Sequence, residues 1–364
     1  MKPYWPPILA SGMTARAQGL DRMRALAAQL PDQFANGYRD GTEAARGTLG
    51  PRPRPTYAVG IGGSAISGDL ARVVFERETK VPLVVVRGPA LPAAADRDSL
   101  AILLSHSGTS WEAVSAYDEA RRKGMRMVAI TSGGELAERA ERDGVPLIVI
   151  NPDMPPRCSV GLVLGSILGL LDAWFPESNE DRVGRIADRL RAQHAIYAAH
   201  GGLPARLAAR LGRRLPFVYG DGPLLPVARR WATQLEENAK RLATFDEVPE
   251  TYHNAIVAWD RLARSDGHRL ATFFLEWEGT HPKIRASNRY FERMVARKGV
   301  RTLRVAFDSS DLLEALLEGT LVGDLTSLEL AARGRVDPLA IDAIARYRDF
   351  LAGSSAREAA ARRS

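Results

Sequence analysis

Residues 100–120, "LAILLSHSGTSWEAVSAYDEA", join an apolar run to a helical pattern through a loop rich in hydroxyl side chains. The run at 100–105 is almost continuously apolar, which is typical of a strand buried on both faces of a parallel sheet. One hydroxyl residue is enough to cap the helix that follows, yet four precede it: Ser105, Ser107, Thr109 and Ser110. Hydroxyl groups and the free amides of a helix N-terminus suit a phosphate monoester, so this loop predicts a phosphate site.

The apolar runs on either side of this stretch indicate the fold of the first half. They lie at 56–61, 82–88, 126–132 and 146–152, and amphipathic stretches or loops separate them. Strands that alternate with helices are typical of a doubly wound α/β domain. We therefore expect residues 56–176 to form a five-stranded parallel sheet flanked by helices, the last of them at 159–175.

The second half repeats this plan more weakly. Strands are expected at 215–222, 270–277 and 302–307, and helices at 226–243, 287–299, 311–333 and 338–352. We expect a second doubly wound domain over 183–352, also with a parallel five-stranded sheet, joined to the first near "PESNEDR" (176–182). Residues 1–55, with two helices within 13–48 and the linker "TLGPRPRP" (48–55), should pack on the two domains. A disordered tail is expected at 353–364.

Composition limits the classes of function. The chain has 364 residues, a net charge of +7 from dispersed basic residues, and one cysteine, Cys158. A single cysteine excludes an intrachain disulfide and a multi-cysteine metal site. No apolar run approaches the roughly 20 residues of a membrane span, and "MKPYWPPILA" (1–10) lacks the pattern of a signal peptide. We expect a cytoplasmic protein that binds a small anion and neither nucleic acid nor membrane.

A glycine loop follows the first strand. "VGIGGSAISGDLARVV" (59–74) includes Gly63 and Ser64 and lets backbone amides approach a ligand at a helix start. A dinucleotide would require a third glycine and an acidic end to the next strand, but Ala65 and Arg87 stand at those positions. A nicotinamide cofactor is therefore disfavoured. "TSGG" (131–134) is a third such loop, and three neighbouring loops favour a phosphate site over simple capping.

An ordered set of motifs then extends over nearly the whole chain. They are "GIGGSAISGD", "LSHSGTSWEA", "ITSGGEL", "MPPRCSVG", "EENAKRLATFDEVPETYHNAIVAW", "HPKIRASNRYFE" and "LTSLELAARGRVDP". The chain resembles the bifunctional phosphoglucose/phosphomannose isomerase family, which is built from two sugar-isomerase (SIS) domains. The serine loop alone would indicate only an SIS domain, whereas "EENAK" followed by "HN" is more specific.

The resemblance also selects candidate catalytic residues. Glu237 lies opposite the apolar stripe of its helix, and chemistry alone does not separate it from Glu236. The resemblance implies that Glu237 is the base that transfers the proton and that His253 assists ring opening from the partner subunit of a homodimer. It places Arg157 beside the reacting carbons, where a fixed cation stabilises an enediolate. Without the resemblance, Glu237, His253 and Arg157 would each be interpreted as a surface or capping residue.

The chain departs from the family pattern at several positions. A lysine expected in the C-terminal helix aligns with Arg348, which cannot readily release a proton. Thr109 and Ser110 replace an expected Asn–Thr pair, and Ala255 replaces an acidic residue after "HN". These changes suggest a divergent member. His106 of the serine loop is expected to have a packing role.

The resemblance implies an aldose–ketose isomerase of glycolysis and gluconeogenesis. It would interconvert glucose 6-phosphate and mannose 6-phosphate with fructose 6-phosphate through an enediolate, with no metal and no cofactor. Phosphate would be held by Gly63, Ser64 and the hydroxyls of the serine loop. Two alternatives remain open: a sugar-phosphate-binding protein with weak or no activity, and an isomerase for another phosphosugar.

Overall fold

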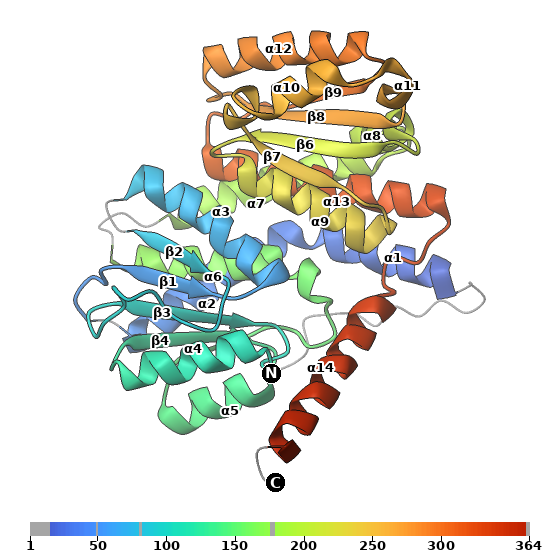
Figure 1. The fold of residues 1–364 in the computed structure, drawn as a ribbon. Helices are drawn as coiled ribbons and strands as arrows, with labels where there is room; N and C mark the ends of the chain where they lie inside the picture. Colours follow the sequence, from blue (N-terminus) through green and yellow to red (C-terminus); the bar gives the residue numbers. More distant parts are fainter. Residues whose placement is uncertain (1–14, 49, 80–81, 175–178, 362–364) are drawn as a thin grey trace.

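The computed structural model describes residues 15–48, 50–79, 82–174 and 179–361. The first residues of the expected interdomain linker, at 176–178, lie outside this part of the chain, as does residue 175. Two α/β bodies are stacked on each other, with long helices between their sheets (Figure 1). No helix among the described residues is long and apolar enough to cross a membrane.

The first sheet is the five-stranded parallel sheet that the sequence predicts. Its strands are β1 (Thr56–Val59), β2 (Leu83–Val86), β3 (Leu100–Ser105), β4 (Arg126–Thr131) and β5 (Leu147–Val149), in the order β2-β1-β3-β4-β5. Helices α3 (Gly62–Glu78) and α6 (Val160–Asp172) pack on one face, and α4 (Trp111–Arg122) and α5 (Gly134–Asp143) cover the other. Because all strands are parallel, the loops after β1, β3 and β4 meet at one edge.

The second sheet differs from the prediction, because the described residues form four strands and not five. They are β6 (Leu215–Asp221), β7 (Thr244–Val248), β8 (Leu270–Trp277) and β9 (Arg301–Phe307), all parallel, in the order β7-β6-β8-β9. The sequence pattern did not indicate β7. Its residues "TFDEV" form an edge strand in which only Val248 is buried, so they give no apolar run.

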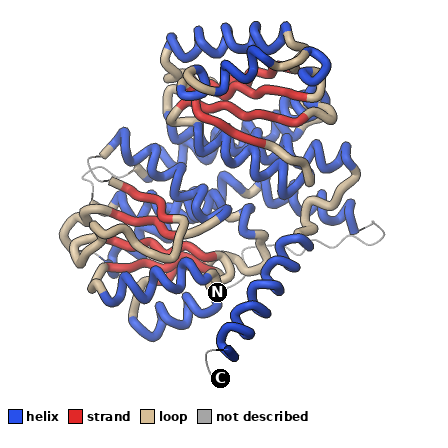
Figure 2. The backbone as a smooth tube through the Cα atoms, viewed as in Figure 1, coloured by secondary structure: helices blue, strands red, loops and turns tan. Residues whose placement is uncertain are grey.

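The helices of the second half complete this body. They are α7 (Glu180–Ala198), α8 (Leu203–Leu211), α9 (Leu225–Ala239), α10 (Ala255–Arg261), α11 (Arg264–Gly267), α12 (Pro282–Arg297), α13 (Leu312–Gly334) and α14 (Asp342–Ala361), with short 3-10 helices η1 (Pro156–Cys158) and η2 (Glu250–Tyr252). Helix α9 ends earlier than expected, and Leu242 is exposed. Helix α14 extends over most of the expected disordered tail and projects from the body (Figure 2). Its "AREAAA" segment has high helix propensity.

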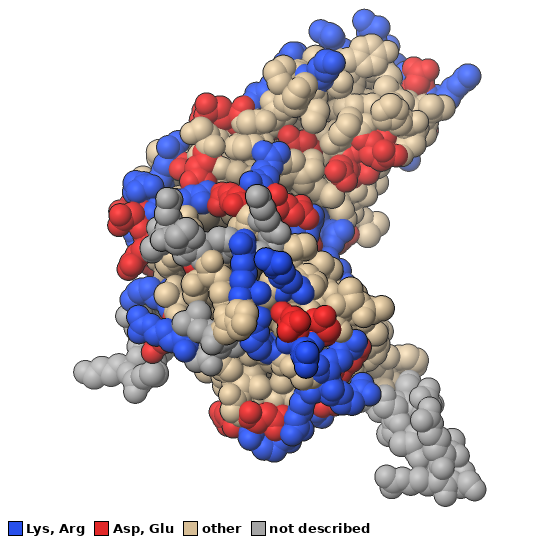
Figure 3. All heavy atoms as spheres, turned by 90° about the vertical axis from the view of Figure 1, so that its left-hand side faces the viewer, with Lys and Arg blue, Asp and Glu red and all other residues tan. Residues whose placement is uncertain are grey.

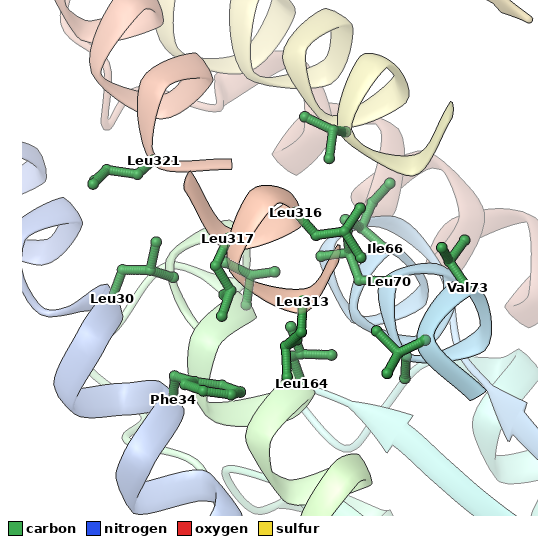
Figure 4. Close-up of a cluster of buried hydrophobic side chains, with 14 of the residues drawn as sticks. Leu30, Phe34, Ile66, Leu70, Val73, Leu164, Leu313, Leu316, Leu317 and Leu321 are labelled. Atoms are coloured by element: carbon green, nitrogen blue, oxygen red, sulfur yellow. The ribbon is translucent and has the colours of Figure 1, made fainter. Parts of the chain in front are cut away.

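Of the N-terminal helices, α2 (Leu30–Thr48) packs mainly on α6, whereas α1 (Ala15–Ala28) packs mainly on α13 of the second half. Glycines of α6 permit very close contact with α2: a Cβ at Gly165 would lie 2.2 Å from the backbone oxygen of Phe34. Buried side chains of α2, α3, α6 and α13 form one cluster, including Phe34, Leu164 and Leu317 (Figure 4). The two halves of the chain therefore share a core.

Candidate active site

The serine loop lies where the sequence predicts, at the carboxyl end of β3. Ser105 is buried, and its Oγ accepts a hydrogen bond of 3.0 Å from the Ser110 hydroxyl. The hydroxyls of Ser107 and Thr109 lie 3.0 Å apart and are exposed. The loop thus presents hydroxyl groups and the first amides of α4 at one edge of the sheet. Neutral donors of this kind can bind a phosphate monoester.

The "TSGG" loop after β4 supports the serine loop. The Ser132 amide donates to the His106 carbonyl at 2.9 Å, and the Leu136 amide donates to the Gly108 carbonyl at 2.9 Å. Gly108 has a positive φ of 67°, and a Cβ there would lie 1.7 Å from the Gly133 oxygen. Only glycine fits this contact, so the third loop fixes the backbone of the serine loop.

The glycine loop after β1 faces the 3-10 helix η1. Helix α3 begins at Gly62, which has a positive φ of 56°, and Ser64 is buried in its first turn. A Cβ at Gly63 would lie 3.1 Å from the Pro156 oxygen and 3.2 Å from the Arg157 Cα. The predicted phosphate loop and Arg157 are therefore close neighbours.

Arg157 is the centre of the polar contacts between the two halves of the chain. Its side chain is 4% exposed. Its Nε donates to Asn238 Oδ1 at 2.8 Å, its Nη2 donates to the Pro338 carbonyl at 2.6 Å, and its Nη1 lies 3.3 Å from Glu237 Oε2. The guanidinium is thus held in one orientation while Glu237 remains one-third exposed. A fixed cation beside an accessible carboxylate can stabilise developing negative charge where a proton is moved.

The two adjacent glutamates of α9 have different surroundings. Glu237 contacts Arg157, whereas Glu236 is exposed. Partial desolvation raises the pKa of the Glu236 carboxyl. Sequence chemistry alone did not separate them; the structure brings Glu237 to Arg157.

A buried network behind Arg157 was not predicted from the sequence. Arg230 makes two hydrogen bonds to Asp324, of 2.9 and 2.7 Å, and its Nη2 also donates to the Arg157 carbonyl at 2.9 Å. Gln234 donates to Asp324 at 2.9 Å, and Asn238 donates to Ser327 at 2.8 Å. Polar residues at 230, 234 and 238 recur every four positions on α9, and this spacing was the available signal.

The other two predicted catalytic residues lie elsewhere on this chain. His253 is exposed after η2, beyond the carboxyl end of β7. Helix α9 leads from the carboxyl end of β6 back to the start of β7, so Glu237, in its last turn, lies at the opposite end of the second sheet (Figure 1). Arg348 is exposed on α14. Within one chain His253 is therefore not brought to Glu237.

Two further predicted side chains fit structural roles. Burial raises the pKa of the Cys158 thiol to about 12, so it is a poor nucleophile. Burial also lowers the pKa of His106, which is half-buried against the loop at 151–154. Within the part of the chain that the structure describes, no group of three or more His, Cys, Asp or Glu side chains is arranged to hold a metal ion.

Comparison with known proteins gives the class first. A model of the SIS domain matches residues 54–150, and a model described as the bacterial phospho-glucose isomerase C-terminal SIS domain matches residues 203–351. A solved structure of glucosamine-6-phosphate deaminase from Thermotoga maritima superposes with a TM-score of 0.67 and 17% identity, covering 88% of this chain and 96% of that one. The fold is thus that of a protein with two SIS domains.

Curated relatives then define the family. A bifunctional phosphoglucose/phosphomannose isomerase of Caldicellulosiruptor bescii is 35% identical, over 67% of this chain and 73% of the relative. One from Thermoplasma acidophilum is 31% identical, over 78% and 86%. The chain belongs to the bifunctional phosphoglucose/phosphomannose isomerase family.

Proposed function

We propose that this protein is an aldose–ketose isomerase that interconverts glucose 6-phosphate and mannose 6-phosphate with fructose 6-phosphate. The observation that carries the proposal is the pairing of Glu237 with the buried Arg157 beside the predicted phosphate loops. Membership of the family and the named activity of its relatives support the same reaction. The cytoplasm, which contains hexose phosphates, is the compartment that fits this activity.

The phosphate group is placed at the carboxyl end of the first sheet. Gly63 and Ser64 at the start of α3, with the amides and hydroxyls of the serine loop before α4, supply the donors. The residues of that loop are Ser105, Ser107, Thr109 and Ser110. Because these donors are neutral, the site recognises the phosphate without neutralising it and leaves the charged residues for carbons 1 and 2.

Glu237 moves the proton between carbons 1 and 2. Its carboxylate removes the proton from carbon 2 of the open-chain aldose, which gives an enediolate with its charge on oxygen 1. The hydroxyl proton of oxygen 2 passes to oxygen 1, and Glu237 returns its proton to carbon 1, which gives the ketose. Arg157 offers its positive charge to the enediolate oxygens, and its bonds to Asn238 and Pro338 hold it in place. Rotation about the carbon 2–carbon 3 bond would present either face of carbon 2 and so accommodate both epimers.

A second copy of the chain supplies His253. In one chain this residue and Glu237 lie at opposite ends of the second sheet, which supports a histidine donated by a partner subunit. A homodimer would complete two sites at once, because a twofold axis relates each donated histidine to the other.

Replacement of the glutamates tests the reaction. Glu237→Gln removes the base and keeps the shape, and isomerisation of fructose 6-phosphate should fall at least about 100-fold. Glu236→Gln is the matched control and should retain activity. Near-wild-type turnover by Glu237→Gln would refute the assignment. If the wild type binds hexose phosphates in calorimetry but gives no turnover, the protein is a sugar-phosphate-binding member of the family.

Subunit mixing tests the origin of His253. Glu237→Gln and His253→Ala are each expected to be inactive. After they are denatured and refolded together at equal amounts, half of the dimers are mixed and each mixed dimer has one intact site. Activity should therefore recover to about a quarter of the wild-type value. Absence of recovery, with mixed dimers shown by native mass spectrometry, would mean that each chain uses its own histidine.

A further inference from the structure

Lys240 ends helix α9 in a conformation that lysine rarely adopts. It has a positive φ of 54° and a ψ of 41°, in the left-handed region where glycine is the usual residue after a helix. A side chain there is disfavoured relative to glycine. A lysine in this strained position suggests that its side chain has a use beyond ending the helix.

The Lys240 side chain reaches back toward Glu237 and Arg157. Its Nζ donates to the backbone carbonyl of Glu237 and lies 3.5 Å from the carbonyl of Pro338. The same Pro338 carbonyl accepts a bond from Arg157 Nη2. The ammonium and the guanidinium therefore share an acceptor at the rim of the candidate site. Lys240 is also exposed enough to contact a ligand.

The surroundings of Lys240 favour release of its proton. Burial, and after it the charge of Arg157, lower the pKa of the ammonium. The carboxylates of Asp337, Glu237 and Asp342 act in the opposite direction and do not cancel this effect. A lowered pKa makes this ammonium a stronger acid than that of an ordinary lysine.

We infer that Lys240 is a further catalytic residue of the proposed isomerase and protonates the ring oxygen when the cyclic hexose phosphate opens. As the carbon 1–oxygen 5 bond breaks, its electron pair takes a proton from Nζ. The hydroxyl proton of carbon 1 leaves to a base, for which the proposed function provides His253, and the carbon 1 carbonyl forms. The neutral amine recovers a proton from water, or from the oxygen 5 hydroxyl when the ring closes.

The experiment separates ring opening from proton transfer between carbons. Exchange spectroscopy with ¹³C-labelled glucose 6-phosphate measures conversion between the two anomers, and deuterium uptake from D₂O measures transfer at carbons 1 and 2. Lys240→Gly should slow anomer exchange by about 100-fold or more, while its Tm stays the same or rises because glycine relieves the left-handed strain. Lys240→Arg keeps the charge but not the labile proton and should lose anomer exchange as well.

Controls separate this inference from the proposed function on which it rests. Glu237→Gln should keep enzyme-catalysed anomer exchange and lose deuterium uptake. An inactive wild type would refute the isomerase itself. An active wild type whose Lys240→Gly variant retains anomer exchange would refute only the role of Lys240. If Lys240→Arg retains anomer exchange and Lys240→Gly does not, ring opening requires the positive charge and not the labile proton. That result would also refute the acid role.

Discussion

Asp324→Asn tests the buried network that holds Arg157. Arg230 and Asp324 are 2% and 12% exposed at the side chain and make two hydrogen bonds to each other. The variant keeps one acceptor oxygen but turns an amide toward Arg230 and leaves its guanidinium buried without a countercharge. Removal of one partner of a buried pair costs about 3–5 kcal/mol. Because one hydrogen bond survives, we expect about 3 kcal/mol.

Urea unfolding at 25 °C, followed by circular dichroism, measures this loss. A loss of that size should lower the Tm by roughly 6–12 °C for a domain of this size. Glu76→Gln is the control, because its partner Arg72 is an exposed neighbour on α3 and such pairs contribute about 0.5 kcal/mol or less. The turnover number of Asp324→Asn should also fall, since Arg230 binds the Arg157 carbonyl. Equal stability of the two variants would refute the reasoning.

Three further predictions concern packing, the phosphate loop and pH. Gly165→Ala should destabilise the fold by about 1–3 kcal/mol because its Cβ meets a backbone oxygen, whereas Gly184→Ala, with open space around it on α7, should stabilise by about 0.5–1 kcal/mol in the same urea assay. Ser110→Ala should raise the KM for fructose 6-phosphate about tenfold at little change in Tm, and an unchanged KM would remove Ser110 from the phosphate site. Burial lowers the pKa of His194, so the unfolded chain binds the proton more tightly than the folded chain does. The free energy of unfolding should therefore fall as the pH drops below about 6.5. His194→Gln should reduce this fall, measured by urea titrations at about pH 8 and pH 5.5.

The first domain was predictable because its strands are buried on both faces. Residues 100–105 are buried throughout, and the sequence shows this as an unbroken apolar run. Strand β7 lies at an edge and carries polar side chains, so the same criterion failed there. The composition of residues 353–361 suits either a solvated tail or an isolated helix, and apolar pattern alone does not separate the two.

The candidate site was predictable only in part. Hydroxyl groups after a strand and a glutamate within a family motif are local patterns, and the second of them gave Glu237, which contacts Arg157 of the first domain. The partner of Arg230 is 94 positions away in the chain, so no local spacing reveals it. Arg230 is buried, and can hold the Arg157 carbonyl, because α13 packs against α9.

The position of the site between the domains has a chemical consequence. Arg157 comes from the first half of the chain and Glu237 from the second. The Pro338 carbonyl, which accepts from Arg157 and from Lys240, precedes α14. In the proposed site, the acid–base groups and the phosphate loops therefore come from different domains. In the proposed mechanism, the first domain supplies the phosphate donors and the fixed cation, and the end of α9 supplies the carboxylate and Lys240. The distance between phosphate and proton-transfer groups is therefore set by packing between the domains, so a core substitution at their border should alter turnover even where it touches no substrate.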